Sequence, residues 1–303
     1  MGRIVVLGSA NMDLVVRQPR RARAGETMFG TAFATGPGGK GLNQAVAAAR
    51  AGASVAFIGA VGADDFGVAL RSFLQAEGVD VSRLPITDHS TGIAQITVTD
   101  DGENSIVVVP GANDRSLLDA GDRDAIAGAS HLVVQLERPA SLLVEAMAFA
   151  RSHAVTTVLT PAPVSDGIDA LVELADILIP NEGEAAQLSG EMDAEAAARA
   201  LSLIATTVVV TLGARGAIVA RHGELVARVD AHDVAPVDTT AAGDTFTGVL
   251  VARLADGIPL ESALQAASAA AAISVTRRGA AESMPFAGEI DERLASAATP
   301  SPN

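Results

Sequence analysis

The stretch HLVVQLERPASLLVEAMAFARSHAVTTVLTP, residues 131–161, contains two short apolar runs separated by a longer segment of helical composition. The runs HLVVQL and VTTVLTP are continuously apolar, as expected for strands that are buried on both faces. The segment SLLVEAMAFARSH between them is long enough for a helix. A strand, a helix and a second strand in this order predict two parallel strands in a sheet that helices cover.

The same alternation continues on both sides of this stretch. Further apolar runs are IVVLG at residues 4–8, SVAFIG at 54–59, DILIPN at 176–181 and TTVVVTLG at 206–213, with alanine-rich segments between them. Repeated strands and helices of this kind indicate an α/β fold with a central, mostly parallel sheet flanked by helices. We therefore expect one α/β domain over residues 1–303.

Two regions break this rhythm. Residues 14–35 and 89–109 contain segments in which apolar and polar residues alternate, as in TGIAQITVTDDGENSIVVV. The turn DDGEN joins two of these segments as a β-hairpin. The two regions predict a small β-sheet lid that projects from the main body.

Composition excludes several classes of protein. With 21 basic and 36 acidic residues the net charge is −15, which argues against binding to nucleic acid or to an anionic membrane. The chain has no cysteine, and its five histidines lack metal-ligand spacing. No stretch approaches the roughly 18 apolar residues of a membrane span, and we expect no signal peptide, because the strand-like run RIVVLG begins where one would need a longer apolar helix. We expect a cytoplasmic protein with soluble small-molecule ligands.

The stretch GPGGKG, residues 36–41, matches the G-x-G-x-x-G pattern of dinucleotide-binding folds. The preceding TMFGTAFAT is too polar for a buried central strand, and Lys40 places a cation inside the turn, so this interpretation is disfavoured. A P-loop would need glycine at Ala34 and a hydroxyl at Gly41. The remaining interpretation is a tight glycine turn at the start of a helix. Lys40 and Asn43 lie at this helix start, where they suit a hydroxyl-rich ligand.

Polar residues follow the first predicted strand. In VVLGSANMDLVV, Asn11 and Asp13 lie just past the carboxyl end of that strand, where open α/β sheets bind their ligands. A carboxylate beside an amide offers acceptors and donors for sugar hydroxyls. A simple turn-forming role for NMD is the alternative.

The stretch DTTAAGDTFTG, residues 238–248, places small residues directly before a long apolar segment. Small residues at a helix start expose several backbone N–H groups, which together with the helix dipole attract anionic charge. Asp244 in the first turn is either an ordinary helix-start carboxylate or a base aimed at the group that attacks a bound phosphate. Spacing alone leaves both roles open.

Two further strand ends carry candidate ligand groups. PNEGEA places Asn181, Glu182 and Glu184 after the run DILI, and its carboxylates could organise Mg²⁺ through water, although glutamate is also common in a first helical turn. TLGARG, residues 211–216, follows the next strand. Its glycines would let the backbone approach a nucleotide, but the motif alone is unspecific.

Taken together and in this order, these motifs resemble the ribokinase family of carbohydrate kinases from about Ile4 to Ser283. The matching stretches are GSANMD, GGKGLNQAVAAAR, TGIAQITV, GENSIVVVPGAN, LERP, PNEGEA, TLGARG, DTTAAGDTFTG and VTRRGA. GGKGxNQ and AAGD are specific to that family. The lid segments resemble its ribokinase branch more than its fructokinase or adenosine kinase branches.

The resemblance implies a ribokinase-like fold and ATP-dependent phosphorylation of the primary (5-) hydroxyl of D-ribose. It implies that Asp244 is the general base and that the amides of Ala242, Gly243 and Asp244 form the anion hole. The implied sugar ligands are Asn11, Asp13, Gly39, Lys40, Asn43, Glu137 and Asp244. The implied ATP-site residues are Asn181, Thr211, Leu212, Gly213, Ala214, Arg215, Gly216, Gly243 and Ser268.

The resemblance also implies metals and a partner. Glu184 would help to place Mg²⁺ through water. A potassium-type monovalent cation would be held by Asp238, Thr240, Ser274, Arg277, Gly279 and Ser283, several of them through backbone carbonyls. Two chains would pair through their β lids as a homodimer.

The sequence leaves rival functions and contains departures from the family pattern. A kinase for deoxyribose, for a fructose- or tagatose-type sugar or for adenosine, and a non-catalytic sugar or nucleotide sensor, are the alternatives. Ser268 stands where many relatives carry a larger neighbour of adenine, which bears on nucleotide preference. Thr160 stands where asparagine is frequent, and RRARAGE, residues 20–26, is unusually basic beside the lid.

Overall fold

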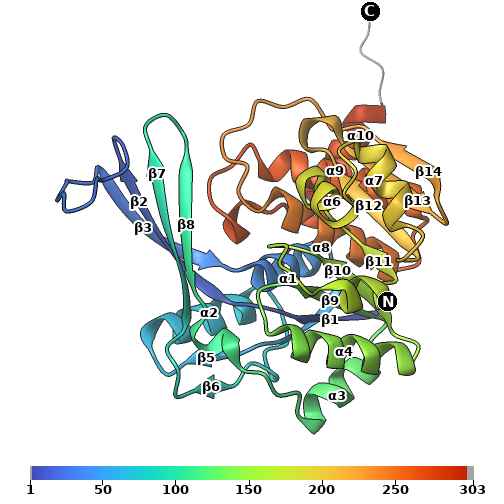
Figure 1. Ribbon diagram of the computed structural model, residues 1–303, viewed down its shortest axis with the longest axis horizontal. Helices are drawn as coiled ribbons and strands as arrows, with labels where there is room; N and C mark the ends of the chain where they lie inside the picture. Colours follow the sequence, from blue (N-terminus) through green and yellow to red (C-terminus); the bar gives the residue numbers. More distant parts are fainter. Residues whose placement is uncertain (1, 299–303) are drawn as a thin grey trace, which may run out of the picture.

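A computed structural model describes residues 2–298 and builds them around one large sheet (Figure 1). From edge to edge, the sheet comprises β4 (Ser54–Ile58), β1 (Arg3–Leu7), β9 (His131–Gln135), β10 (Thr156–Thr160), β11 (Ile177–Leu178), β12 (Thr207–Thr211), β13 (Ala217–Arg221) and β14 (Glu224–Val229). The first six strands are parallel and the last two pair antiparallel. The predicted α/β fold with a mostly parallel sheet is confirmed.

Helices cover both faces of this sheet because its strands are apolar on both sides. Along β1, Ile4 and Val6 join one core cluster, whereas Val5 and Leu7 join the other. The first cluster includes α1 (Lys40–Arg50), α2 (Asp65–Ala76), α8 (Ala242–Ala255), α9 (Leu260–Ser274) and α10 (Ala287–Ala298). The second includes α3 (Ala120–Ala127), α4 (Ala140–Ser152), α5 (Asp169–Glu173), α6 (Glu182–Ser189) and α7 (Ala194–Leu201).

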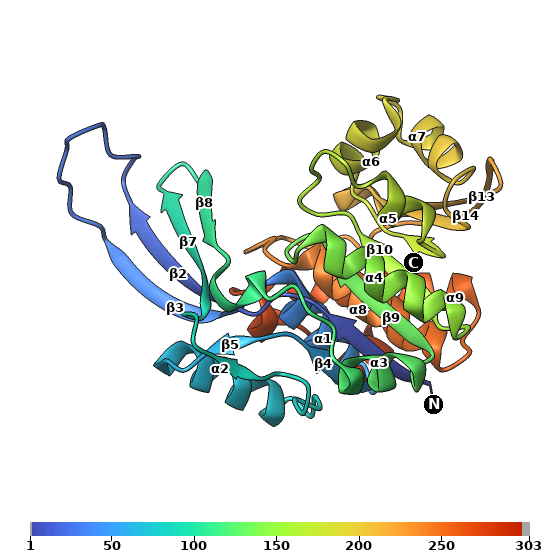
Figure 2. The ribbon, with the colours of Figure 1, turned by 60° about the horizontal axis from the view of Figure 1, so that its bottom comes forward.

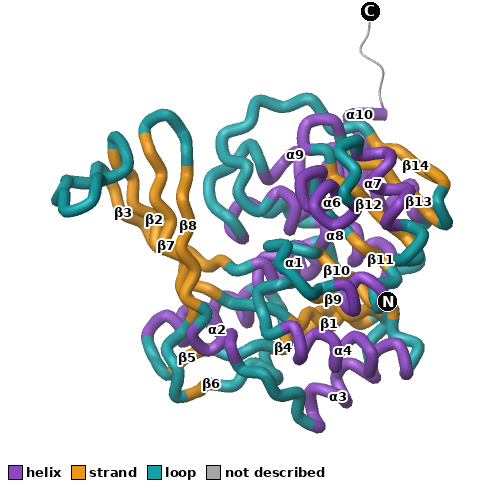
Figure 3. Tube along the Cα trace, in the orientation of Figure 1, coloured by secondary structure: helices purple, strands orange, loops and turns teal. Residues whose placement is uncertain are grey.

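A separate four-stranded sheet projects from the body, as Figures 1 and 2 show. Its order is β3 (Ala32–Gly38), β2 (Asn11–Gln18), β7 (Gly92–Thr99) and β8 (Asn104–Val109), and β2 pairs parallel with β7 while the outer pairs are antiparallel. In Figure 3, where strands are orange and helices purple, these long strands stand apart from the helical body. This sheet, which we call the lid sheet, confirms the predicted small projecting sheet.

Short elements connect these parts. They are β5 (Val61–Gly62), β6 (Ile86–Thr87) and the 3-10 helices η1 (Gly111–Asp114), η2 (Gly213–Arg215) and η3 (Ala281–Ser283). Within residues 2–298, no helix combines the length and the apolar character that a membrane span needs.

Close packing of α1 against α8 brings two distant segments together. A side chain at Gly248 in α8 would place its Cβ 2.5 Å from the Cβ of Ala47 and 2.6 Å from the carbonyl oxygen of Gln44. A side chain at Gly41 would lie 2.6 Å from the Cα of Gly8, at the end of β1. Because these glycines allow close approach, the start of α1 lies at the carboxyl ends of the strands and beside the start of α8.

Candidate active site

Asp244 occupies the first turn of α8 and is 7% exposed. Its Oδ2 accepts a hydrogen bond from Asn43 Nδ2 at 3.0 Å, and its Oδ1 accepts one from Gln44 Nε2 at 2.8 Å. Both donors lie in α1, about 200 residues earlier in the chain. The carboxylate therefore faces the amino-terminal polar segment and not the apolar core.

The start of α8 leaves backbone donors free. Ala241 precedes the helix with φ 58° and provides no side-chain cap. Within residues 2–298, the N–H groups of Gly243 and Asp244 donate to no protein acceptor, whereas that of Ala242 donates to the carbonyl of Thr239 at 3.3 Å. A Cβ on Gly243 would meet nothing within 4 Å. Free donors at the positive end of a helix, with open space before them, are suited to an anion.

An acidic cluster surrounds the start of α1. Glu137 accepts hydrogen bonds from Ser9 Oγ and, at 3.0 Å, from the backbone N–H of Lys40. Gly38 lies so close to Asp13 that a Cβ there would be 2.3 Å from both carboxylate oxygens. Gly39 has φ 91°, a conformation that favours glycine. The glycine turn thus lets carboxylates approach the helix start.

Burial and mutual repulsion shift the pKa values of these acids. Burial raises the pKa of Asp13 from 3.8 to about 7, and the charges of Glu137 and Asp244 add to this shift. Burial also raises the pKa of Asp244, although Lys40 and the amides of its two α1 neighbours oppose the shift. The charge of Asp244 raises the pKa of Lys40. Lys40 therefore stays charged and partly neutralises the cluster.

Asn11 lies at the start of β2 and is 2% exposed. Its Oδ1 accepts a hydrogen bond from Asn113 Nδ2 at 2.8 Å, and Asn113 also exchanges hydrogen bonds with the backbone of Ala10. Sequence reasoning missed Asn113 as a supporting residue. Its only signal was its place in the family-like stretch GENSIVVVPGAN.

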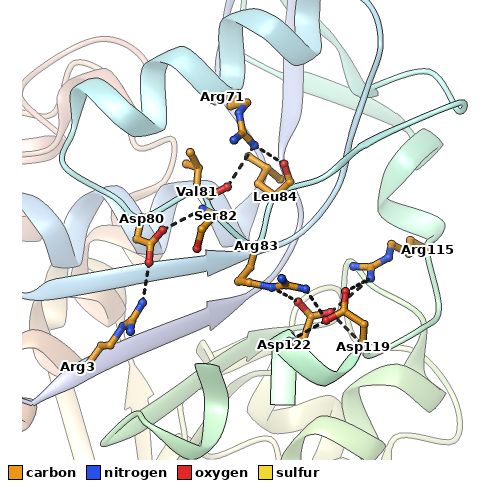
Figure 4. Close-up of polar contacts among 10 residues, drawn as sticks. All are labelled: Arg3, Arg71, Asp80, Val81, Ser82, Arg83, Leu84, Arg115, Asp119 and Asp122. Carbon is orange, nitrogen blue, oxygen red and sulfur yellow. Dashed lines mark hydrogen bonds and ion pairs between the residues drawn. The ribbon is translucent and has the colours of Figure 1, made fainter. Parts of the chain in front are cut away.

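The segment that carries Asn113 is anchored by ion pairs, which Figure 4 shows. Asp122, fully buried in α3, accepts from Arg83 Nε at 2.9 Å and from Arg115 at 3.4 Å. Arg115 follows η1 directly. Because a buried carboxylate needs such partners, the pairs fix the end of η1 against α3.

Arg138 ties this segment to two strand ends. Its guanidinium donates to the carbonyl of Arg115 at 2.8 Å and to that of Gly8 at 3.1 Å. Arg138 follows Glu137 in the chain and is 6% exposed. The end of β1, the loop after β9 and the segment after η1 are thereby held in one arrangement.

A pocket of about 500 Å³ opens on the other side of the α8 start. The predicted ATP-site residues Thr211, Gly213, Ala214, Gly216, Gly243 and Ser268 line it. Ala242, predicted for the anion hole, lines it as well. Sequence reasoning missed the lining residues Ala231, His232, Asp233, Val234, Phe246, Ala271, Ala272 and Val275, which have no nucleotide signature.

Four predicted nucleotide-site or Mg²⁺ residues lie apart from this lining. Leu212 is buried, and Arg215 forms an exposed ion pair with Glu182. Asn181 and Glu184 form a capping box at the start of α6, in which Glu184 donates its N–H to Asn181 Oδ1 at 2.8 Å and Glu184 Oε2 accepts from the Asn181 N–H at 2.8 Å. The second carboxylate oxygen of Glu184 remains available for water or a metal.

The residues predicted for a monovalent cation lie in the loop before α8 and in the stretch from the end of α9 through η3. Asp238 accepts from Thr240 N at 3.0 Å, from Thr240 Oγ1 at 2.7 Å and from Gly279 N at 3.1 Å. Ser274 Oγ and Ser283 Oγ donate to the carbonyls of residues 271 and 280. The Arg277 side chain pairs with Glu289, so only its backbone can face the loops.

A second pocket of about 500 Å³ lies between the lid sheet and these loops. Asp13, Gly36, Asp238 and Gly279 are among its lining residues. Both pockets share Thr239, three residues before Ala242. The start of α8 therefore lies where a ligand under the lid and a ligand in the first pocket would meet.

The raised pKa of Asp13 predicts a pH-dependent stability. The pKa is near 3.8 in the unfolded chain and about 7 in the folded chain, so the folded state loses stability as the pH rises from about 4 to about 7. We expect Asp13→Asn to raise the free energy of unfolding at pH 8 by about 2–4 kcal/mol, since a tenfold change in proton affinity is worth about 1.4 kcal/mol. The gain should shrink towards pH 4.

Chemical denaturation between pH 5 and pH 8 measures this difference. The surface variant Asp124→Asn, on α3, serves as the control and should stay within about 0.5 kcal/mol of the wild type at each pH. Equal stabilities of Asp13→Asn and wild type at pH 8 would contradict the prediction.

Comparison with known proteins gives a family match over most of the chain. Residues 1–287 match the family described as pfkB family carbohydrate kinase. The chain is 39% identical to ribokinase of Bacillus subtilis strain 168 over 297 residues, covering 97% of this chain and 100% of that protein. The structure of Arabidopsis thaliana ribokinase complexed with ribose and ATP has a TM-score of 0.91 at 30% identity, covering 97% of this chain and 98% of that chain.

A more distant solved structure has the same fold. An Escherichia coli chain in complex with ATP and Mg²⁺ has a TM-score of 0.83 at 23% identity, covering 98% of this chain and 100% of that one. The family match spans both the polar cluster at the start of α1 and the helix start of α8. The chain belongs to the pfkB family of carbohydrate kinases.

Proposed function

We propose that this sugar kinase is a ribokinase, which transfers the γ-phosphoryl group of ATP to the primary (5-) hydroxyl of D-ribose. One observation carries the proposal. The carboxylate of Asp244 faces the amino-terminal polar cluster, while Ala242 and Gly243 of the same helix turn line the pocket on the other side. Full-length similarity to proteins named ribokinase supports ribose as the sugar.

In this proposal Asp244 accepts the proton of the attacking hydroxyl. In phosphoryl transfer the protein itself contributes little covalent chemistry. The rate therefore depends on the alignment of the reacting groups and on stabilisation of the negative charge on the transferred phosphoryl group. The N–H groups of Gly243 and Asp244, with that of Ala242, receive the negative charge of the phosphoryl group. Asn11, Asp13, Gly39, Lys40, Asn43 and Glu137 hold the sugar.

The lid sheet would exclude water from the sugar. Water in the site could otherwise accept the phosphoryl group, so closure favours transfer to the sugar over hydrolysis of ATP. That the chain forms a single domain with lid segments at residues 14–35 and 89–109 stays a prediction. The cytoplasmic location stays a prediction as well.

ATP and Mg²⁺ suit the residues of the first pocket. The apolar wall formed by Ala271, Ala272 and Val275 suits an adenine ring. Mg²⁺ commonly uses one or two carboxylates plus water and phosphate oxygens, so the free oxygen of Glu184 is a sufficient protein ligand. Bound Mg²⁺ would neutralise phosphate charge during transfer.

The loops around Asp238 suit a monovalent cation. They offer one carboxylate together with hydroxyl and carbonyl oxygens, and among residues 2–298 no group of three His, Cys, Asp or Glu forms a polyvalent metal site. In the proposal this set, with one carboxylate and otherwise neutral oxygens, holds a monovalent cation such as K⁺. The candidate ligands Asp238, Thr240, Ser274, Arg277, Gly279 and Ser283 would fix the loop that leads into α8.

A homodimer would cover the lid sheet. All six residues of β8 are exposed, including Ile106 at 53% and Val107 at 62%. Phe33 on β3 is 66% exposed. An exposed apolar edge strand favours association, and a second lid is the natural cover for it.

Kinases for other sugars or nucleosides are the main alternatives, because one hydroxyl more or less changes only a few contacts. A coupled assay of ADP release over ribose, deoxyribose, fructose, tagatose and adenosine distinguishes them. We expect the highest kcat/KM with ribose. No turnover with any of these would favour the sensor alternative.

Removal of the base should abolish turnover and spare binding. A positioned general base contributes roughly 10²–10⁴-fold to the rate, so we expect Asp244→Asn to lose about that factor in kcat. Ribose affinity by calorimetry should remain similar. Asp291→Asn on the surface of α10 is the matched control, and near-normal turnover of Asp244→Asn would refute the role.

Potassium should activate the enzyme. Because the cation would stabilise the loop before the anion hole, we expect higher kcat in KCl than in NaCl at equal ionic strength, by several-fold. Asp238→Asn should reduce this ratio. Equal rates in the two salts would remove the cation from the proposal.

Light scattering tests the dimer. We expect micromolar protein to have twice the 30.5-kDa mass of the chain. Ile106→Arg should give a monomer, because a buried unpaired charge opposes association, whereas Leu203→Arg, at a site 74% exposed on the body, should remain dimeric. A monomeric wild type would contradict the proposal.

A further inference from the structure

A chain of three buried side chains ends at the proposed base. Gln135 Nε2 donates to Gln44 Oε1 at 2.7 Å, and Gln44 Nε2 donates to Asp244 Oδ1 at 2.8 Å. Gln135 is 0% exposed and Gln44 is 1% exposed. The three residues come from β9, α1 and α8, so the chain links the sheet to the two helices that form the site.

The hydrogen bonds that join these three side chains can run in only one direction from donor to acceptor. An ionised carboxylate only accepts hydrogen bonds, so Gln44 must turn its NH₂ group towards Asp244. Its carbonyl oxygen then points the other way and needs a donor, which Gln135 supplies through its own NH₂ group. If Gln44 were inverted, its oxygen would face a carboxylate oxygen and repel it. Gln135 therefore supplies the donor for the orientation of Gln44 that Asp244 requires.

In this position Gln135 leaves one of its own polar atoms without a hydrogen-bond partner among the described residues. Its Oε1 is buried and accepts no hydrogen bond within residues 2–298. The side chain fits only because Gly8 has none, since a Cβ there would lie 2.3 Å from Gln135 Oε1. A buried amide with one unsatisfied end is unfavourable for folding, which indicates that its donor end has a function.

Gln44 has a second, weaker contact that restrains it further. Its Nε2 lies 3.3 Å from Thr160 Oγ1, at the end of β10. The longer distance makes this the weaker of its two donor contacts. Asn43 donates to the other oxygen of Asp244, so the two amides together fix the plane of the carboxylate.

We propose that Gln44 and Gln135 are positioning residues, which fix the carboxylate of Asp244 so that its remaining lone pair points at the sugar hydroxyl. The inference rests on the proposed role of Asp244 as the base. Lys40 supplies charge to this site but no fixed direction, because its ammonium is a point charge on a flexible stem. The amide chain supplies the direction.

The proposal predicts a loss in kcat without a loss of sugar affinity. A small misplacement of a reacting group can cost about 10²-fold in rate, so we expect Gln44→Met to lower kcat by roughly 10–100-fold. Gln135→Met should lower kcat by about 3–10-fold, since Gln44 keeps its donor but loses the partner that orients it. KM for ribose and for ATP should stay within about twofold of wild type. Methionine matches glutamine in length and flexibility.

The double variant gives the sharpest test. If Gln135 acts only through Gln44, then Gln44→Met combined with Gln135→Met should be no slower than Gln44→Met alone. Gln135→Glu should be slower than Gln135→Met, because the new carboxylate would attract the NH₂ group of Gln44 and turn its oxygen towards Asp244. Gln75→Met, exposed on α2, is the control and should match wild type. Thermal unfolding and ribose calorimetry confirm that each variant is folded.

The outcomes separate the two proposals. Unchanged kcat in Gln44→Met and Gln135→Met, with Asp244→Asn inactive, would overturn the positioning role and leave the proposed function intact. Losses that multiply in the double variant, or that occur only in the KM for ribose, would also overturn it. Near-normal turnover of Asp244→Asn would instead refute the base itself.

Discussion

The contact between α1 and the first turn of α8 is the constraint on which the site depends. A carboxylate with 7% exposure is costly to ionise, and Asp244 can carry charge only because two amides and a lysine from one helix turn face it. That approach is possible only because Gly248 has no side chain. Around this contact, the polar cluster at the start of α1 and the first pocket lie on opposite sides of one helix start.

The acidic residues near this contact show how function competes with stability. Asp13 and Glu137 bring further negative charge to a buried place, and Asp13 is the residue whose pKa rises to about 7. An apolar residue there would suit the apo fold better. Such groups are retained at sites where a ligand later supplies their missing partners.

Much of this organisation could be predicted from the sequence, but the chain of hydrogen-bonded side chains that ends at Asp244 could not. Continuous apolar runs predicted the parallel sheet, alternating segments predicted the lid sheet, and the small residues before Asp244 predicted a helix start with free amides. Gln44 ends the family-specific stretch GGKGxNQ, but neither Gln44 nor Gln135 signalled this contact, because glutamine in a helix or at a strand end is ordinary and the two residues are 91 positions apart. Asn181 and Glu184 stood out in the sequence as candidate nucleotide and Mg²⁺ residues, and the structure adds that they also cap the start of α6 through each other.

Ala241 illustrates how the backbone itself prepares the site. An alanine at φ 58° lies in the left-handed region, which costs roughly 1–2 kcal/mol for a residue with a Cβ. Because of this left-handed residue the helix begins at Ala242, and the N–H groups of Gly243 and Asp244 find no acceptor among residues 2–298, whereas that of Ala242 still reaches the carbonyl of Thr239. The molecule thus stores a small local strain beside two free backbone donors, which in the proposed function would receive the phosphoryl group.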